Sequence, residues 1–165
     1  MKALNDLPAA EAREGFLACC GAARWADAMV AVRPFEDQQA LFDEADRIWS
    51  GLQREDYLEA FAAHPRIGDA EALRGRFRSD RFAHGEQSGA AGADDAVLAE
   101  LARANRQYEE RFGYIFIVCA TGKSAREMLD LLKARLGNRP EDELQVAAEE
   151  QAKITRLRLQ KLLGS

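Results

Sequence analysis

Apolar residues recur every three or four positions along almost the whole chain, and sustained alternation of apolar and polar residues is scarce. The clearest example is the stripe formed by Leu41, Ala45, Ile48, Trp49 and Leu52. Because this spacing puts side chains on one face of an α-helix, it predicts amphipathic helices around a shared core. The 165 residues suit one hydrophobic core. We therefore predict an all-α, single-domain helical bundle that comprises residues 1–165.

Proline, glycine and capping residues predict where the helices begin and end. One helix should follow Pro8 and end at Gly21, and a short helix through Tyr57 should end near His64. Ser124 and Glu127 have the spacing of a capping box, in which each residue accepts a hydrogen bond from the backbone of the other. The last helix should begin near Pro140, with acidic residues in its first turn.

Two stretches depart from this helical pattern. Residues 65–93 are rich in glycine, arginine and aspartate and lack a long apolar period, so we predict a long loop, which in a compact domain is commonly functional. The stretch FGYIFIVCATG at 112–122 contains five strand-favouring residues in a row. Because the sequence offers it no partner strand, we predict a buried helical segment.

Composition and charge exclude several classes of protein. The net charge of −5 and the dispersed basic residues argue against nucleic acid as a partner. No apolar run approaches the ~20 residues that span a bilayer, and the first residues lack a signal peptide's apolar stretch. We therefore expect a cytoplasmic protein without a membrane partner. The three cysteines, two of them adjacent, indicate reduced, buried thiols. No metal-binding motif such as CxxC or HExxH is present.

His64 is the first candidate for chemistry. It precedes Pro65, which disfavours the α conformation in the residue before it, so the imidazole should lie at the C-terminal end of a helix. The negative end of the helix dipole favours the imidazolium by ~0.3–2 kcal/mol. A proton-donor role is one interpretation, and a simple helix stop is the other.

Three further features could contact a ligand. The pair Glu86-Gln87, between glycines of the loop, offers a general base beside an amide, although a solvated loop would also contain such residues. The segment 112–122 could line a pocket with backbone groups, or be core alone. Arg158 lies at the edge of an apolar face, where it could bind a carboxylate or simply reach solvent.

Five stretches together resemble the family of 2-oxo-4-hydroxy-4-carboxy-5-ureidoimidazoline (OHCU) decarboxylases, in order and in approximate spacing. They are HPRIG at 64–68, GEQSGA at 85–90, RFGYIFIVCATGKSA at 111–125, RLGN at 135–138 and ITRLRLQKLL at 154–163. The resemblance implies an all-helical homodimer that needs no cofactor and no metal. It also implies a small-molecule substrate, OHCU, which the family converts to (S)-allantoin in the breakdown of urate.

The resemblance also implies roles for individual residues. His64 is expected to be the catalytic acid–base, and Glu86 is expected to act with it on the substrate. Substrate-binding contacts are expected from Pro65, His84, Gln87, Phe116, Ile117, Val118, Cys119, Ala120 and Arg158.

One position departs from the family pattern: Ala83 stands where the family commonly has a serine, which puts the local binding geometry in doubt. Two other functions stay open at this point. The chain could be another ureide-processing enzyme that uses the same histidine and glutamate, or a helical interaction domain without activity.

Overall fold

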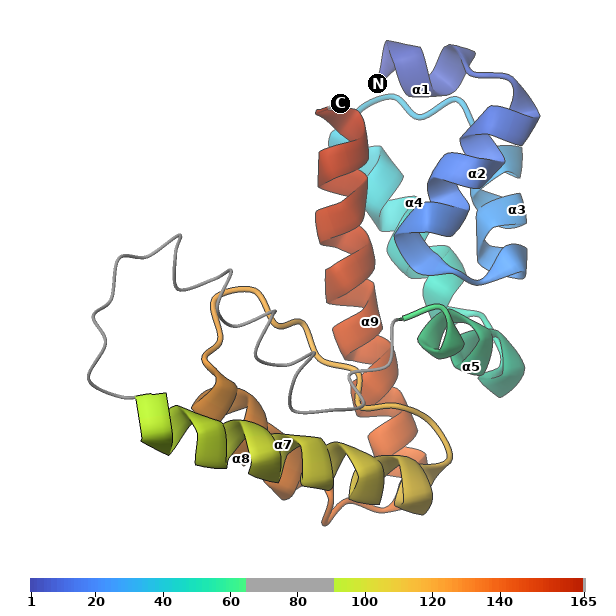
Figure 1. Ribbon diagram of the computed structural model, residues 1–165. Helices are drawn as coiled ribbons and strands as arrows, with labels where there is room; N and C mark the ends of the chain where they lie inside the picture. Colours follow the sequence, from blue (N-terminus) through green and yellow to red (C-terminus); the bar gives the residue numbers. More distant parts are fainter. Residues whose placement is uncertain (65–90, 165) are drawn as a thin grey trace. The chain divides into compact units, whose positions relative to one another are not determined.

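The computed structural model describes residues 1–64 and 91–164, and the regular structure in these ranges is entirely helical (Figure 1). The predicted all-α fold class is confirmed. The loop predicted at 65–93 lies outside the described residues except for its last three positions, which already belong to helix α7, Ala91–Phe112. Within the described ranges, no helix has both the length and the apolar character needed to cross a bilayer.

Contacts divide the chain into two compact units, which we describe separately. The first unit contains Met1–His64, Ile117–Cys119 and residues 145–164. The described part of the second unit contains residues 91–116 and Ala120–Leu144. The helices of the first unit are α1 (Lys2–Asp6), α2 (Ala9–Cys20), α3 (Ala23–Ala31), α4 (Gln38–Ser50), α5 (Arg54–Ala62) and the larger part of α9 (Pro140–Leu163). The second unit contains α7, α8 (Ala125–Arg135) and the start of α9.

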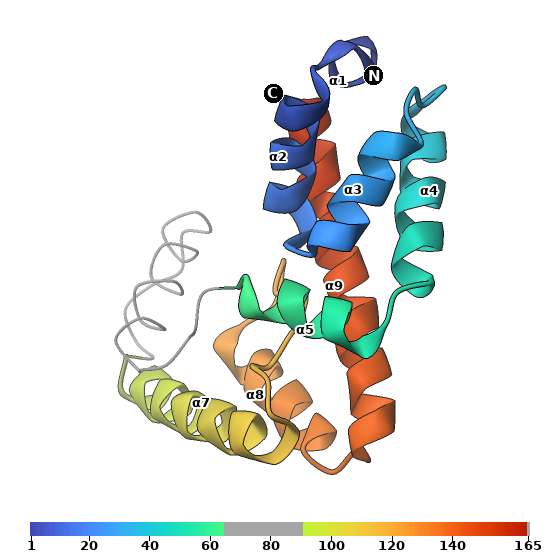
Figure 2. The ribbon, with the colours of Figure 1, turned by 90° about the vertical axis from the view of Figure 1, so that its right-hand side faces the viewer.

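The first unit is a helical bundle in which α3 packs against α2, α4 and α5. Figure 2 shows α2, α3 and α4 beside the C-terminal part of α9. Two tryptophans tie the helices together, because a buried indole N–H needs an acceptor. Trp25 donates to the carbonyl of Ala45 at 3.1 Å, and Trp49 donates to the carbonyl of Ala148 at 3.0 Å. The second of these bonds fixes α9 against α4.

The predicted helix ends are confirmed. Gly21 ends α2 with a φ of 90°, a left-handed conformation that glycine adopts without strain. At the start of α8, the Ser124 backbone N–H donates to Glu127 Oε2 at 2.8 Å, and the Glu127 N–H donates to Ser124 Oγ at 3.3 Å. Helix α5 ends at Ala62, two residues before His64.

The helix predicted at 112–122 is wrong. After α7 ends at Phe112, the chain is non-helical as far as the start of α8. Gly113 and Gly122 have φ values of 80° and 75°, which an α-helix does not permit. Between them lie Ile115, Ile117 and Val118, β-branched residues that disfavour helix. The segment forms no strand either, and Ile117 is buried at 2% exposure.

The second unit is centred on a buried ion pair. Helix α7 packs on α8, and Glu143, in the first turn of α9, is completely buried. Its carboxylate accepts from the Arg135 guanidinium at 2.6 and 2.8 Å and from the Tyr108 hydroxyl. Asn138 Nδ2 donates to the second carboxylate oxygen at 2.7 Å. Burial, then the bond to Glu143, raises the pKa of Tyr108, so this hydroxyl stays protonated as the donor.

All three cysteines are thiols. The predicted burial is confirmed for Cys19 and Cys20, at the end of α2, and is wrong for Cys119, which is half-buried. Burial raises the pKa of Cys19 and Cys20 from 9.0 to about 11. At neutral pH both therefore behave as small apolar side chains.

Glu143→Ala tests the buried ion pair. We expect the free energy of unfolding to fall by about 3–5 kcal/mol, because the variant leaves the Arg135 guanidinium buried without this opposite charge. Urea unfolding followed by circular dichroism measures the change. Glu141→Ala, in an exposed pair with Arg139, is the matched control and should unfold as the parent does. Equal unfolding midpoints for the two variants would contradict this description.

Alkylation should distinguish the cysteines. In the folded protein at mildly alkaline pH, we expect iodoacetamide to modify Cys119 well before Cys19 and Cys20. The raised pKa of the two buried thiols lowers their thiolate fraction by about a hundredfold, and the thiolate is the reactive form. Mass spectrometry of peptides gives the rates, and in urea all three should react alike. Similar rates for the three residues in the folded state would refute the burial of Cys19 and Cys20.

Candidate functional site

His64 lies immediately after α5 and is held at two points. Its backbone N–H donates to the carbonyl of Phe61 at 3.2 Å, which extends the last turn of the helix. Its side chain is half-buried, and Nε2 lies 2.5 Å from Oε1 of Gln151 on α9. The predicted position of the imidazole at a helix C-terminus is therefore confirmed, and a second helix fixes it there.

Gln151 is completely buried, although a buried amide is costly unless its polar atoms are bonded. Both ends of this amide have partners. Oε1 lies against His64, and Nε2 donates to Oγ1 of Thr155 at 3.1 Å. Thr155, one helical turn further along α9, is 6% exposed. A buried polar chain thus runs from His64 into the interior of the first unit.

The segment Ile117–Cys119 is tied to the same helix. The backbone N–H of Cys119 donates to Glu150 Oε2 at 2.7 Å, and Lys153 bonds the other carboxylate oxygen at 2.5 Å. The hydrogen bond that Lys153 donates to Glu150 raises the pKa of Lys153, which keeps this ammonium charged. A side chain of α9 therefore supplies the partner that a neighbouring strand would otherwise give to this backbone group.

Arg158 also lies on α9, two turns beyond Gln151. One of its guanidinium nitrogens donates to the carbonyl of Cys19 at 3.2 Å, at the C-terminal end of α2. That carbonyl would otherwise lack a helical partner, and the negative end of the helix dipole favours a cation there. The 3.6-residue period places Arg158, Thr155 and Gln151 on one face of α9. This face and His64 form the core of the candidate site.

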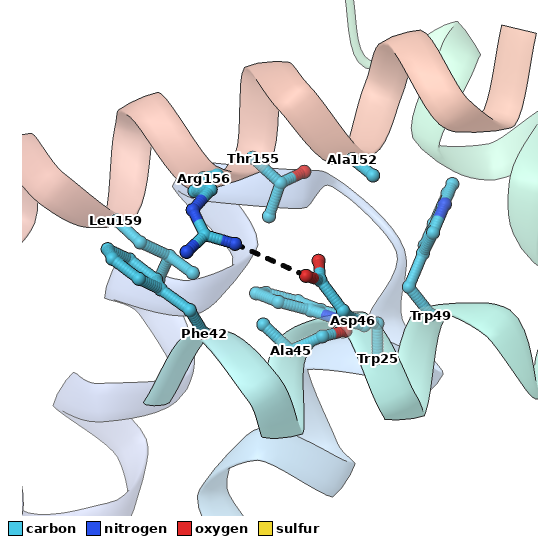
Figure 3. Close-up of a pocket in the computed structure, with 9 residues that line it drawn as sticks. All are labelled: Trp25, Phe42, Ala45, Asp46, Trp49, Ala152, Thr155, Arg156 and Leu159. Carbon is cyan, nitrogen blue, oxygen red and sulfur yellow. Dashed lines mark hydrogen bonds and ion pairs between the residues drawn. The ribbon is translucent and has the colours of Figure 1, made fainter. Parts of the chain in front are cut away.

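A small cavity on α9 adjoins this site, and the two share Thr155. It is lined by Trp25, Phe42, Ala45, Asp46, Trp49, Ala152, Thr155, Arg156 and Leu159 (Figure 3). Arg156 pairs with Asp46 at 3.4 Å and lies over the ring of Phe42, 4.3 Å from its centroid. The volume is about 10 Å³, enough for about one water molecule and far too little for a heterocyclic substrate. We regard it as a packing feature between α4 and α9.

The remaining predicted site residues fall into two groups. Pro65, His84, Glu86 and Gln87 lie outside the described residues. Phe116 and Ala120 belong to the second unit, where the Phe116 ring lies 4.6 Å from the Arg135 guanidinium. The first unit contains the other predicted site residues, His64, Ile117, Val118, Cys119 and Arg158. Among residues 1–64 and 91–164, no cluster of three or more histidine, cysteine, aspartate or glutamate side chains is arranged to hold a metal ion.

Three residues of the site were not predicted: Glu150, Gln151 and Thr155. A signal for two of them exists in the sequence. The apolar stripe of α9 runs through Leu144, Ala147 and Ala148 and then continues with Gln151 and Thr155 before Leu159. Polar residues in a core stripe indicate buried hydrogen bonds, but only the structure shows that the partner is His64, 87 positions earlier.

Comparison with known proteins identifies the family of this chain. A sequence model of the family described as OHCU decarboxylase matches residues 5–160. The "uric acid degradation bifunctional protein TTL" of Arabidopsis thaliana is 42% identical over 147 residues, which cover 88% of this chain and 45% of that protein. The 2-oxo-4-hydroxy-4-carboxy-5-ureidoimidazoline decarboxylase of Amia calva is 38% identical over 100 residues, 61% of this chain and 57% of the relative.

A solved structure has the same fold. The crystal structure of OHCU decarboxylase in the presence of (S)-allantoin superimposes with a TM-score of 0.74 at 37% sequence identity, and the match covers 93% of this chain and 99% of that one. The chain spans about half the length of the two curated relatives named above, at 45% and 57%. Because the family match nonetheless runs from residue 5 to residue 160, the chain belongs to the OHCU decarboxylase family.

Proposed function

We propose that this chain decarboxylates OHCU to (S)-allantoin in the breakdown of urate, and that it does so without a cofactor. The observation that carries the proposal is the arrangement of His64, whose imidazole is fixed by Gln151 on the face of α9 that also presents Arg158. The likeness to an OHCU decarboxylase crystallised in the presence of (S)-allantoin supports the same substrate and product.

The reaction makes two demands on the site. The bond from the ring carbon to the carboxylate breaks, and its electron pair passes into the ring system while CO₂ leaves. That developing charge needs stabilisation, and a proton must then reach the ring from one side only. A fixed acid–base group and fixed polar contacts to the ring meet both demands, since positioning alone can supply a large share of the acceleration.

We assign the roles as follows. Glu86 accepts a hydrogen bond from the substrate hydroxyl or takes its proton, and His64 acts beside the departing carboxylate and controls protonation. Arg158, a cation with N–H groups in addition to the one that binds Cys19, orients the anionic substrate. Gln87, Pro65 and His84 supply further contacts to the substrate, as does the backbone of 116–120.

We also propose that residues 1–165 act as one OHCU decarboxylase-like domain, which forms a homodimer and works in the cytoplasm. The single family match that runs through both units supports the first statement. Size-exclusion chromatography with light scattering tests the second.

The direct test generates OHCU in situ from urate with the two upstream enzymes and follows substrate loss and CO₂ release. We expect this protein to accelerate both above the spontaneous rate. Faster substrate loss without faster CO₂ release would instead indicate another ureide-processing enzyme. No acceleration at all would favour an interaction domain without activity.

His64→Asn tests the acid–base assignment. We expect kcat for CO₂ release to fall by about 10²–10⁴-fold, the usual share of general acid–base catalysis, because asparagine cannot exchange a proton. Glu55→Gln, an exposed change in the first turn of α5, is the matched control and should keep the full rate. A His64→Asn variant as fast as this control would exclude His64 from the chemistry.

Two arginines of α9 provide a test of substrate binding. Arg158→Met should raise KM about tenfold or more, since the substrate would lose a charge-assisted contact worth about 1.5–3 kcal/mol. Arg156→Met, two residues earlier, loses the pair with Asp46 and the contact with Phe42 but should keep KM unchanged. If the two variants have equal KM values, Arg158 does not bind the substrate.

A further inference from the structure

The imidazole of His64 is paired with a neutral amide, that of Gln151. His64 Nε2 and Gln151 Oε1 are 2.5 Å apart, and both belong to the first unit. An amide oxygen only accepts hydrogen bonds, so Nε2 must carry a proton in this arrangement. The same is true whether the ring is neutral or an imidazolium.

Thr155 holds the other end of the Gln151 amide. The Gln151 Nε2 group donates to Thr155 Oγ1 at 3.1 Å, while Oε1 lies toward the imidazole. Because Gln151 and Thr155 are both buried, water cannot readily replace the bond between them.

We propose that Gln151 is a positioning residue for His64: its carbonyl oxygen keeps a proton on Nε2, so that Nδ1 is the nitrogen that gains and loses a proton in the reaction. The kinetic part of this inference rests on the proposed function, whereas the position of the proton does not. Gln151 also holds the ring without adding a charge. A negatively charged partner would instead favour the imidazolium.

The charged side chains near His64 are engaged by other partners and do not take the place of Gln151 as the hydrogen-bond acceptor. On α9, Glu150 is engaged by the Cys119 backbone and by Lys153, and Arg158 donates to Cys19. From α2, the side chains of Cys19 and Cys20 are buried thiols. The variants below leave all of these groups unchanged.

Gln151→Met removes the acceptor at similar side-chain volume, and Gln145→Met, at an exposed position of α9, is the matched control. Proton–nitrogen NMR of the imidazoles shows which ring nitrogen carries a proton. The His64 signals are identified by their loss in His64→Asn. We expect the parent and Gln145→Met to show a slowly exchanging proton on Nε2, and Gln151→Met to lose it. A neutral parent ring protonated on Nδ1, or an unchanged signal in Gln151→Met, would overturn the proposal.

Gln151→Glu keeps the acceptor and adds a charge. We expect it to retain the Nε2 proton and to move the His64-dependent limb of the kcat–pH profile to higher pH, because a carboxylate favours the imidazolium. Gln151→Met should lower kcat about tenfold, less than the ~10²–10⁴-fold share of the acid–base group itself. If neither variant shifts the kcat–pH profile, Gln151 does not position His64 for the reaction. If the parent is inactive but shows the predicted NMR signals, only the proposed function is refuted.

Discussion

The bond between His64 and Gln151 is the interaction on which the site depends. It joins two elements that come from distant parts of the sequence, the end of α5 and the middle of α9. Without a fixed partner, a half-buried histidine after a helix end could adopt several rotamers. Burial of Gln151 and its second bond to Thr155 remove that freedom, because each polar atom has a partner of defined direction. The imidazole is therefore positioned before any ligand binds.

Helix α9 supplies the polar contacts that hold the candidate site in the first unit. Successive turns supply an anchor for the Cys119 backbone through Glu150, the partner of His64 through Gln151, and a cation through Arg158. The helix is in turn held by Trp49, whose indole donates to the carbonyl of Ala148. A site built on a rigid, well-packed helix holds its groups more precisely than one built on loops alone. Such precision suits a reaction in which positioning supplies much of the acceleration.

Much of the fold could be predicted from the sequence, since helix formation there is governed by local pattern. The apolar period, Gly21 and the Ser124–Glu127 box each act within a few residues, and the structure confirms all three. The segment 112–122 was predicted wrongly because its conformation depends on distant groups. Its glycines at positive φ break the helix, and the carboxylate of Glu150 replaces the strand partner that the sequence did not offer.

In the candidate site, too, local features could be predicted from the sequence and long-range contacts could not. The place of His64 at a helix end could be predicted from its own neighbours, the helix before it and the proline after it, whereas its role was implied only by the family resemblance. The apolar stripe of α9 indicates that Gln151 is buried, but its partner could not be predicted, because the contact exists only when α5 and α9 meet. Circular dichroism of the allantoin formed from OHCU generated in situ measures directly whether this site decarboxylates OHCU stereospecifically. We expect a rapid rise of an (S)-allantoin signal when the protein is added. A slow, racemic product, identical to that formed without the protein, would contradict it.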